Sequence, residues 1–200
     1  MLTAAGATPQ ATVQMRILAI SGSLRARSAN TATLEAMAKL APSGVDVVPY
    51  RRLGLLPHFN PDLDRVDLPD ALPSEVRELR REVGRSDGLL LSSPEYAHGV
   101  AGAFKNALDW LVGSLEFPGK PVAVINTAPR AKHADAQLRE ILLTMSARLV
   151  QPASITAPIS GVGRDLDASG IAADPALSGQ LRRALDALVD AIATSKAEIS

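Results

Sequence analysis

A short apolar run, Ile17-Leu18-Ala19-Ile20, leads directly into the polar stretch Ser21-Gly22-Ser23-Leu24-Arg25-Ala26-Arg27-Ser28-Ala29-Asn30, and a helical pattern follows. α/β proteins bind phosphate with this order of strand, hydroxyl-rich turn and helix, because the first turn of a helix has unpaired N–H groups and a dipole that favours an anion. The turn contains one glycine, so it is neither a G-x-G-x-x-G dinucleotide turn nor a G-x-x-x-x-G-K-[ST] triphosphate loop. Side chains would therefore make the phosphate contacts, which favours a mononucleotide.

The turn offers hydroxyl, amide and guanidinium groups to such a phosphate. They belong to Ser21, Ser23, Ser28, Asn30, Arg25 and Arg27. A second interpretation stays open, in which the serines and the asparagine only cap the helix and both arginines are solvated.

Apolar runs separated by helical patterns predict a parallel sheet with crossover helices. Four clear strands are expected at Met15–Ser21, Val45–Tyr50, Gly88–Ser92 and Pro121–Asn126, with a weaker fifth around Gln151–Ala157. The third and fourth runs are almost entirely apolar, as expected of strands that are buried on both faces. Helical spacing is found over Asn30–Leu40, Ser74–Arg85 and Ala134–Leu149, and in a last segment with Leu181, Leu185, Leu188 and Ile192.

The composition limits the classes of function. The 200 residues fit one domain, expected at residues 15–200 after a flexible leader at residues 1–14. Basic and acidic residues balance at 21 each, so the charge predicts neither nucleic-acid nor membrane binding. The chain has no cysteine, and its three histidines stand singly on separate loops, so no metal site is expected. The G-x-S-x-G motif of serine hydrolases is also missing from the sequence.

A second polar segment follows the third predicted strand. Ser92-Ser93-Pro94-Glu95-Tyr96 ends that strand, and Phe104-Lys105-Asn106-Ala107-Leu108-Asp109-Trp110 lies on the next predicted helix. Together, GSLRxxSxN after the first strand and PEY…KNALDW after the third resemble the NADPH-dependent FMN reductase family. That family is flavodoxin-like and includes quinone, azo-dye and chromate reductases. The resemblance covers roughly residues 15 to 157.

This resemblance implies an α/β fold, a flavodoxin-like three-layer sandwich whose five-stranded parallel sheet has the order 2-1-3-4-5. Ligands bind such sheets where the strand order reverses, which lies here between the first and third strands. The family's first loop contacts the FMN phosphate, and this implies contacts from Ser21, Ser23, Leu24, Arg25, Ser28 and Asn30. Its second loop implies backbone contacts to the flavin from Pro94, Glu95 and Tyr96, with an ordinary aromatic residue at the rim as the alternative for Tyr96.

After the tyrosine, the chain departs from the family's pattern. Many relatives read PEYN-x-S-x-P-G where this chain reads PEYAHGVAG. Ala97, Gly99 and Ala101 therefore replace an amide, a hydroxyl and a proline. His98 is interpreted either as an exposed loop residue or as a contact to the nicotinamide or the acceptor.

A second departure follows the fourth predicted strand, where the family has a glycine-rich stretch and this chain has the basic loop Asn126–His133. Thr127 and Ala128 are expected to line the flavin site. Arg130, with Lys132 and His133, is interpreted either as a contact to the phosphates of a pyridine nucleotide or as part of a solvated basic loop.

These observations predict an FMN-dependent enzyme that passes a hydride from NADPH or NADH to the flavin and on to a small-molecule acceptor. The acceptor would be free flavin, a quinone, an azo compound or a metal oxyanion. No catalytic side chain is expected, because the flavin carries the chemistry. Two alternatives stay open: a flavodoxin-type electron carrier, although such carriers are usually strongly acidic, and a flavin-free interaction protein.

The proline-rich segment Leu53–Asp64 bears on assembly. It is expected to expose Leu55, Leu56 and Phe59, and contiguous apolar surface usually marks a contact site. Because the family commonly forms dimers or tetramers, a homodimer or homotetramer is expected. The start of the chain is not typical of a secretory signal, and a cytoplasmic location is expected.

Overall fold

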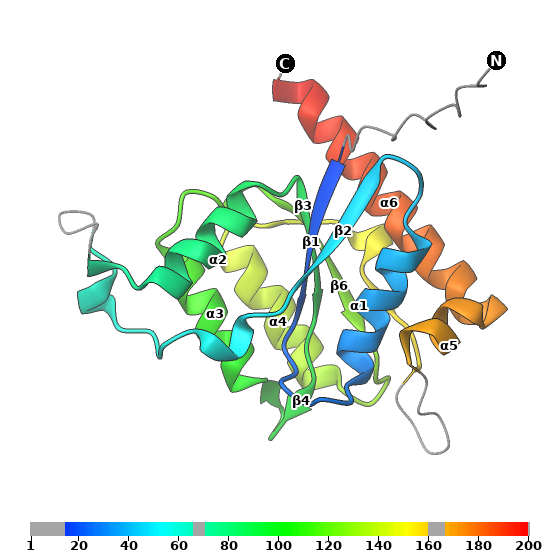
Figure 1. Ribbon diagram of the computed structural model, residues 1–200, viewed down its shortest axis with the longest axis horizontal. Coiled ribbons are helices and arrows are strands. Elements are labelled where there is room, and N and C mark those ends of the chain that lie inside the picture. Colours follow the sequence, from blue (N-terminus) through cyan, green and yellow to red (C-terminus); the bar gives the residue numbers. More distant parts are fainter. Residues whose placement is uncertain (1–14, 66–70, 160–166, 200) are drawn as a thin grey trace, which may run out of the picture.

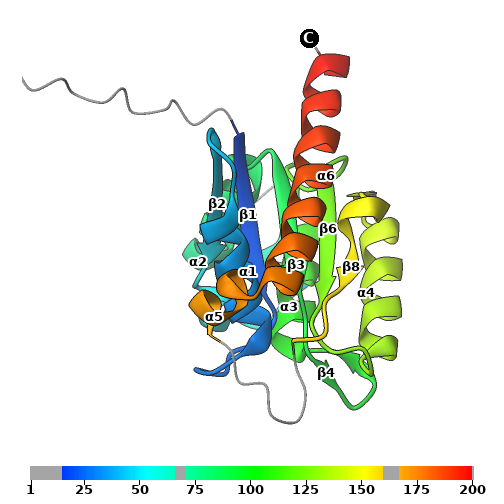
Figure 2. The ribbon, with the colours of Figure 1, turned by 90° about the vertical axis from the view of Figure 1, so that its right-hand side faces the viewer.

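The computed structural model describes residues 15–65, 71–159 and 167–199, and these form three layers (Figure 1). The predicted leader lies outside the described residues. One face of the central sheet is covered by α2 (Ser74–Gly84), α3 (Gly102–Val112) and α4 (Lys132–Thr144). The other face is covered by α1 (Ala29–Leu40), α5 (Ala168–Ala173) and α6 (Pro175–Ile199), as Figure 2 shows from the side.

The sheet confirms the predicted flavodoxin-like order. Its strands run β2 (Val45–Tyr50), β1 (Met15–Ser21), β3 (Gly88–Ser92), β6 (Pro121–Asn126) and β7 (Arg148–Leu149), and each neighbouring pair is parallel. The first four strands have the bounds that the sequence predicts. Leu90 packs into the core on the α1 side, and its neighbours Leu89 and Leu91 pack on the α2 side, as expected of a central strand without a solvated face.

The fifth strand differs from the prediction because it is interrupted. β7 is followed by a 3-10 turn at Gln151–Ala153 and then by the short β8 (Ile155–Thr156), which also pairs with β6. Pro152 lies in the turn and has no N–H to donate. The hydroxyl of Ser154 accepts the hydrogen bond of Val124 N at 3.1 Å, so a side chain replaces a carbonyl of the ladder.

The predicted helix Ala134–Leu149 is too long at its C-terminal end. α4 ends at Thr144, and Ser146 has a left-handed backbone with φ of 62°. Ser146 N and Ala147 N donate to Leu143 O and Leu142 O, which closes the helix end. Leu149, which the helical spacing had included in this helix, belongs to strand β7.

The loop between β2 and α2 is fixed to α3 by Asn106 and Trp110 of the KNALDW motif. Asn106 accepts from Phe59 N at 2.7 Å and donates to Pro57 O at 2.9 Å, while the indole of Trp110 donates to the same carbonyl at 2.8 Å. Leu55 is 60% exposed, as predicted. The expected exposure of Leu56 is wrong, because this side chain packs into the core on the α2 side of the sheet.

Candidate functional site

The carboxyl ends of β1, β3 and β6 meet at one edge of the sheet, and a cavity of about 390 Å³ lies there. The three loops that follow these strands line it. Of the residues that the sequence singled out, the cavity contains Ser23, Arg25, Ser28, Asn30, Pro94, Glu95, Tyr96, Thr127 and Arg130. It also contains Ala128, as expected, and three residues that were not expected to contribute: Ala29, Ser93 and Ala131.

One end of the cavity is formed by the start of α1. Ser28 is the N-cap residue, and its hydroxyl accepts from Thr31 N at 3.3 Å. Among the described residues, no hydrogen-bond partner is found for Ala29 N, Asn30 N or the guanidinium of Arg25. A helix start with free N–H groups and an unpaired arginine beside it is a site for an anion.

The single glycine of this loop is required by close packing. A β-carbon at Gly22 would lie 2.9 Å from Phe104 Cβ, so any other residue would push the loop away from α3. Gly22 N also donates to Ser92 O at 2.7 Å. These contacts hold the end of β1 beside the end of β3.

Asn30 connects all three strand ends. Its side chain is 7% exposed, and its Oδ1 lies 2.8 Å from the hydroxyl of Ser92 and accepts from Thr127 Oγ1 at 3.2 Å. The family resemblance implies a phosphate contact from Asn30. The structure adds a second role for its side chain, which fixes the first loop to the ends of β3 and β6.

The opposite end of the cavity is formed by a small hairpin that the sequence analysis did not predict. β4 (Glu95–Tyr96) and β5 (Gly99–Val100) pair in antiparallel fashion around Ala97 and His98. Both turn residues have left-handed backbones, with φ of 49° and 58°. Such a turn normally contains Asn-Gly or Asp-Gly, and neither occurs here. Tyr96 is 53% exposed on this hairpin.

The third wall follows β6. Thr127 is buried, and the side chain of Asn126 folds the loop back by accepting from Ala128 N at 3.0 Å and donating to Ala131 O at 3.2 Å. Arg130 lines the cavity from this loop, and no partner for its guanidinium is found within the described ranges. Lys132 and His133 begin α4 and do not line the cavity.

Three residues of the predicted set lie outside this cavity. Ser21 accepts from Thr31 Oγ1 at 2.9 Å and from Ser23 N at 3.3 Å, and with Leu24 it lines a neighbouring cavity of about 270 Å³. Leu24 extends toward Gly54, where a β-carbon would lie 3.3 Å from it. His98 stacks on His133, with 4.2 Å between the ring centroids, at the tip of the hairpin.

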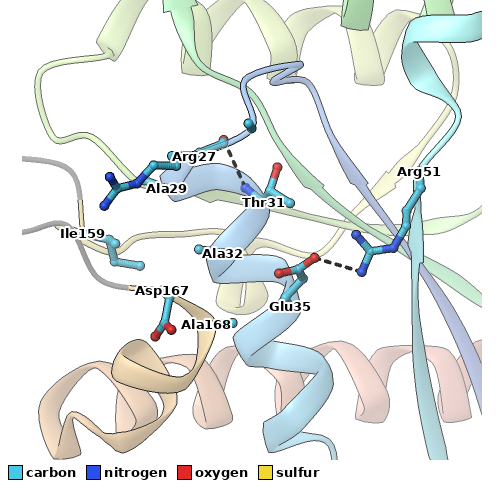
Figure 3. A pocket seen from close by; sticks show the side chains of 11 residues that line it. Arg27, Ala29, Thr31, Ala32, Glu35, Arg51, Ile159, Asp167 and Ala168 are labelled. Carbon is cyan, nitrogen blue, oxygen red and sulfur yellow. Dashed lines mark hydrogen bonds and ion pairs between the residues drawn. The ribbon is translucent and has the colours of Figure 1, made fainter.

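A further cavity, of about 280 Å³, lies on the far side of the first loop (Figure 3). Arg27 lines it together with Glu35, and Glu35 forms an ion pair with Arg51 at 2.9 Å. Arg27 is therefore separated from the cavity that holds Arg25, although the two arginines are close in sequence.

In the part of the chain that the structure describes, no cluster of three or more His, Cys, Asp or Glu side chains has the geometry of a metal site. No described helix has the length and apolar character that a membrane span requires.

The parallel sheet, its strand order and the ligand-sized cavity at the carboxyl edge define the class: a flavodoxin-like nucleotide-binding protein. Residues 15–160 match the NADPH-dependent FMN reductase family. The chain therefore belongs to this family of oxidoreductases, which use FMN and a reduced nicotinamide nucleotide.

Individual relatives agree with this assignment. The chain is 32% identical over 179 residues to the NAD(P)H-dependent FMN reductase of Pseudomonas aeruginosa, covering 87% of this chain and 93% of that one. It is 32% identical over 186 residues to a quinone reductase of Pseudomonas putida, covering 89% and 92%. Among solved structures, FerB, a flavoenzyme NAD(P)H:acceptor oxidoreductase of Paracoccus denitrificans, superposes with a TM-score of 0.75. The sequence identity with FerB is 31%, and the match covers 90% of this chain and 98% of that one.

Proposed function

We propose that the cavity at the carboxyl edge binds FMN and that the protein oxidises NAD(P)H and reduces a small-molecule acceptor. The observation that carries this proposal is the combination of an open helix start and an unpaired Arg25 at one end of the cavity with the Pro94–Tyr96 hairpin at its other end. These are the two segments that carry the family's motifs.

The residues present fit the phosphate of FMN. A phosphate needs several donors at once, and Ser23, Arg25, Ser28 and the first N–H groups of α1 all border one end of the cavity. The positive charge of Arg25 and the helix dipole both favour the dianion. We assign the phosphate to this end.

The opposite end fits the flavin ring. Pro94 has no N–H and stiffens the entry to the hairpin, so the backbone that follows at Glu95 and Tyr96 is directed along the cavity wall. Thr127 and Ala128 form the facing wall. The half-exposed Tyr96 lies at the rim, where a second substrate would approach.

Bound FMN would supply the redox chemistry, since it can accept a hydride from NAD(P)H and return the electrons to an acceptor. The protein's part is to bind and orient both substrates in turn. Among the described residues that line the cavity, no two side chains form an acid–base pair, and a hydride transfer to the cofactor needs none.

Arg130 is our candidate residue for binding the reductant, NAD(P)H. It borders the cavity, and its guanidinium is available to a phosphate of the pyridine nucleotide. The curated relatives are named as FMN and quinone reductases, so a quinone or a second flavin is our proposed acceptor.

An anaerobic titration tests this proposal. The purified protein is loaded with FMN and titrated separately with NADPH and NADH while the flavin absorbance is followed. Bleaching by one equivalent, followed by recovery when a quinone is added, is the expected result. Tight FMN binding without bleaching would indicate an electron carrier, and absence of FMN binding would leave the flavin-free interaction protein.

We further propose a homodimer or homotetramer in the cytoplasm. Leu55 is 60% exposed and Phe59 37% exposed on the loop fixed to α3, and apolar side chains grouped in this way favour a subunit contact. Light scattering at micromolar concentration tests the assembly. A stable monomer would remove this argument without affecting the flavin site.

A further inference from the structure

The hairpin at the ring end of the cavity and helix α4 hold each other by reciprocal hydrogen bonds. The carboxylate of Glu95, on β4, accepts from Ala134 N at 2.8 Å. In the opposite direction, the side-chain oxygen of Gln137, on α4, accepts from Val100 N at 2.8 Å. Each element thus satisfies one backbone donor of the other. Figure 2 shows β4 lying against the first turn of α4.

Helix α4 needs this partner because its own sequence provides no cap. Its N-cap residue is Ala131, whose side chain cannot accept a hydrogen bond. The one acidic residue of its first turn, Asp135, forms an ion pair with Arg139 at 2.8 Å. The Glu95 carboxylate, from outside the helix, supplies the missing acceptor.

The hairpin needs the helix because its turn is strained. Ala97 and His98 both adopt left-handed backbones, which non-glycine residues rarely do. Two contacts to α4 oppose this strain from one side: Gln137 holds β5, and the ring of His133 stacks on His98.

We propose that Glu95 and Gln137 are positioning residues that hold the flavin-ring loop in its binding geometry. Glu95 lines the cavity, and its carboxylate accepts from Ala134 N on α4. One residue therefore joins the hairpin at the ring end of the cavity to the helix that follows the Thr127–Ala131 loop. The contact therefore sets the distance between the hairpin and the Thr127–Ala131 loop before any ligand enters. The flavin part of this inference rests on the proposed function; the contact between hairpin and helix does not.

The first test needs no flavin. Hydrogen exchange is measured on the ligand-free protein for Glu95→Ala, Glu95→Gln and Gln137→Ala. We expect Glu95→Ala to speed exchange about tenfold both at Ala134 and at Val100, which is not its own partner, because losing one bond loosens both elements. Glu95→Gln keeps an acceptor oxygen and should restore most of the protection. Asp135→Asn is the matched control: it removes a carboxylate from the same helix turn, but that group pairs with Arg139.

The second test separates ring positioning from phosphate binding. Glu95→Ala and Gln137→Ala should weaken FMN and riboflavin by the same factor, about tenfold, because the affected loop contacts the ring that both ligands share. Glu95→Gln should recover riboflavin affinity, and Asp135→Asn should leave both affinities unchanged.

The outcomes are distinguishable. If the wild type binds neither flavin while Glu95→Ala still speeds exchange at Val100, the proposed function fails and the contact between hairpin and helix stands. If exchange at Val100 is unchanged in Glu95→Ala, or if only FMN and not riboflavin is weakened, the positioning role is overturned.

Discussion

The two ends of the sheet use their charged residues in opposite ways. At the amino end, Arg16 pairs with Glu82 at 2.5 Å and donates to the hydroxyl of Ser86 at 2.8 Å. Asp87 accepts from Arg16 N at 2.7 Å and pairs with Lys196 of α6 at 2.8 Å. At the carboxyl end, Arg25 and Arg130 border the cavity, and neither guanidinium has a partner among the described residues.

The charged side chains at the amino end stabilise the fold, whereas Arg25 and Arg130 at the carboxyl end are available to bind a ligand. The Arg16–Glu82 pair at the amino end is mostly buried, with 22% and 15% of the two side chains exposed. Unpaired arginines on loops contribute little to folding. Substitutions at the two ends should therefore have opposite effects on stability and on ligand binding, and four predictions test this.

The largest effect is expected for Arg16→Ala. It leaves Glu82 with only the distant Arg85 and removes the hydrogen bond to Ser86, so we expect a loss of about 2–3 kcal/mol in the free energy of unfolding. Urea unfolding measures this loss. FMN affinity should be unchanged. Arg148→Ala, which breaks an exposed pair with Glu198, is the control and should cost well under about 1 kcal/mol.

Arg25→Ala should have the reverse profile. Loss of one charge-assisted contact should weaken FMN about 10- to 100-fold, while the free energy of unfolding changes little. Riboflavin, which has no phosphate, should bind equally to both proteins in fluorescence titrations. Arg27→Ala, in the neighbouring cavity, is the matched control. Equal losses for FMN and riboflavin would mean that the phosphate is bound elsewhere.

Arg130→Ala sharpens the comparison within the carboxyl end. If Arg130 contacts the 2′-phosphate of NADPH, the KM for NADPH should rise by a factor that corresponds to about 1–2 kcal/mol of lost binding free energy. The KM for NADH and the affinity for FMN should be unaffected. Steady-state kinetics with both nucleotides measure this. Lys132→Ala should have the smaller effect because Lys132 does not line the cavity. Equal effects on NADPH and NADH would contradict a contact to the 2′-phosphate.

The smallest effect is expected at Tyr50, at the carboxyl end of β2. Its hydroxyl is buried, and no partner for it is found in the described part of the chain. Tyr50→Phe should therefore raise the free energy of unfolding by about 1 kcal/mol at neutral pH. A lower stability for this variant would mean that the hydroxyl has a partner in solution.

The same residue gives a pH dependence. Burial, only partly opposed by Arg52, raises the pKa of Tyr50 to about 12. Above about pH 10 the unfolded tyrosine ionises while the folded one stays neutral, so wild-type stability falls between about pH 10 and 12. The advantage of Tyr50→Phe should grow in this window, and chemical unfolding at pH 8 and pH 11 measures it.

The main strands could be predicted because each is a short apolar run between polar loops. β3 and β6 are buried on both faces, so nearly every residue in them carries the signal. The fifth strand and the end of α4 were less predictable. In the fifth strand, the hydroxyl of Ser154 takes the place of a backbone carbonyl as the acceptor for Val124 N. At the end of α4, Ser146 adopts a left-handed backbone. Neither feature produces a periodic pattern in the sequence.

The site residues that could be predicted lie on loops that directly follow the predicted strands. Arg25, Ser28 and Tyr96 line the cavity because the ends of parallel strands bring their loops together. The hairpin could not be read from Ala97 and His98, which are poor turn formers. The Glu95–Ala134 contact was also hidden, because it joins residues 39 positions apart that share no motif.

The strained turn at Ala97 and His98 affects the order in which parts of the protein unfold on heating. Left-handed backbones at non-glycine residues cost about 1–3 kcal/mol each, and this hairpin has few buried side chains to offset that cost. It should therefore open locally well below the temperature at which the sheet melts. We expect a heated holoprotein to release its flavin as a separate, reversible early transition, so that inactivation on warming and global unfolding occur at different temperatures.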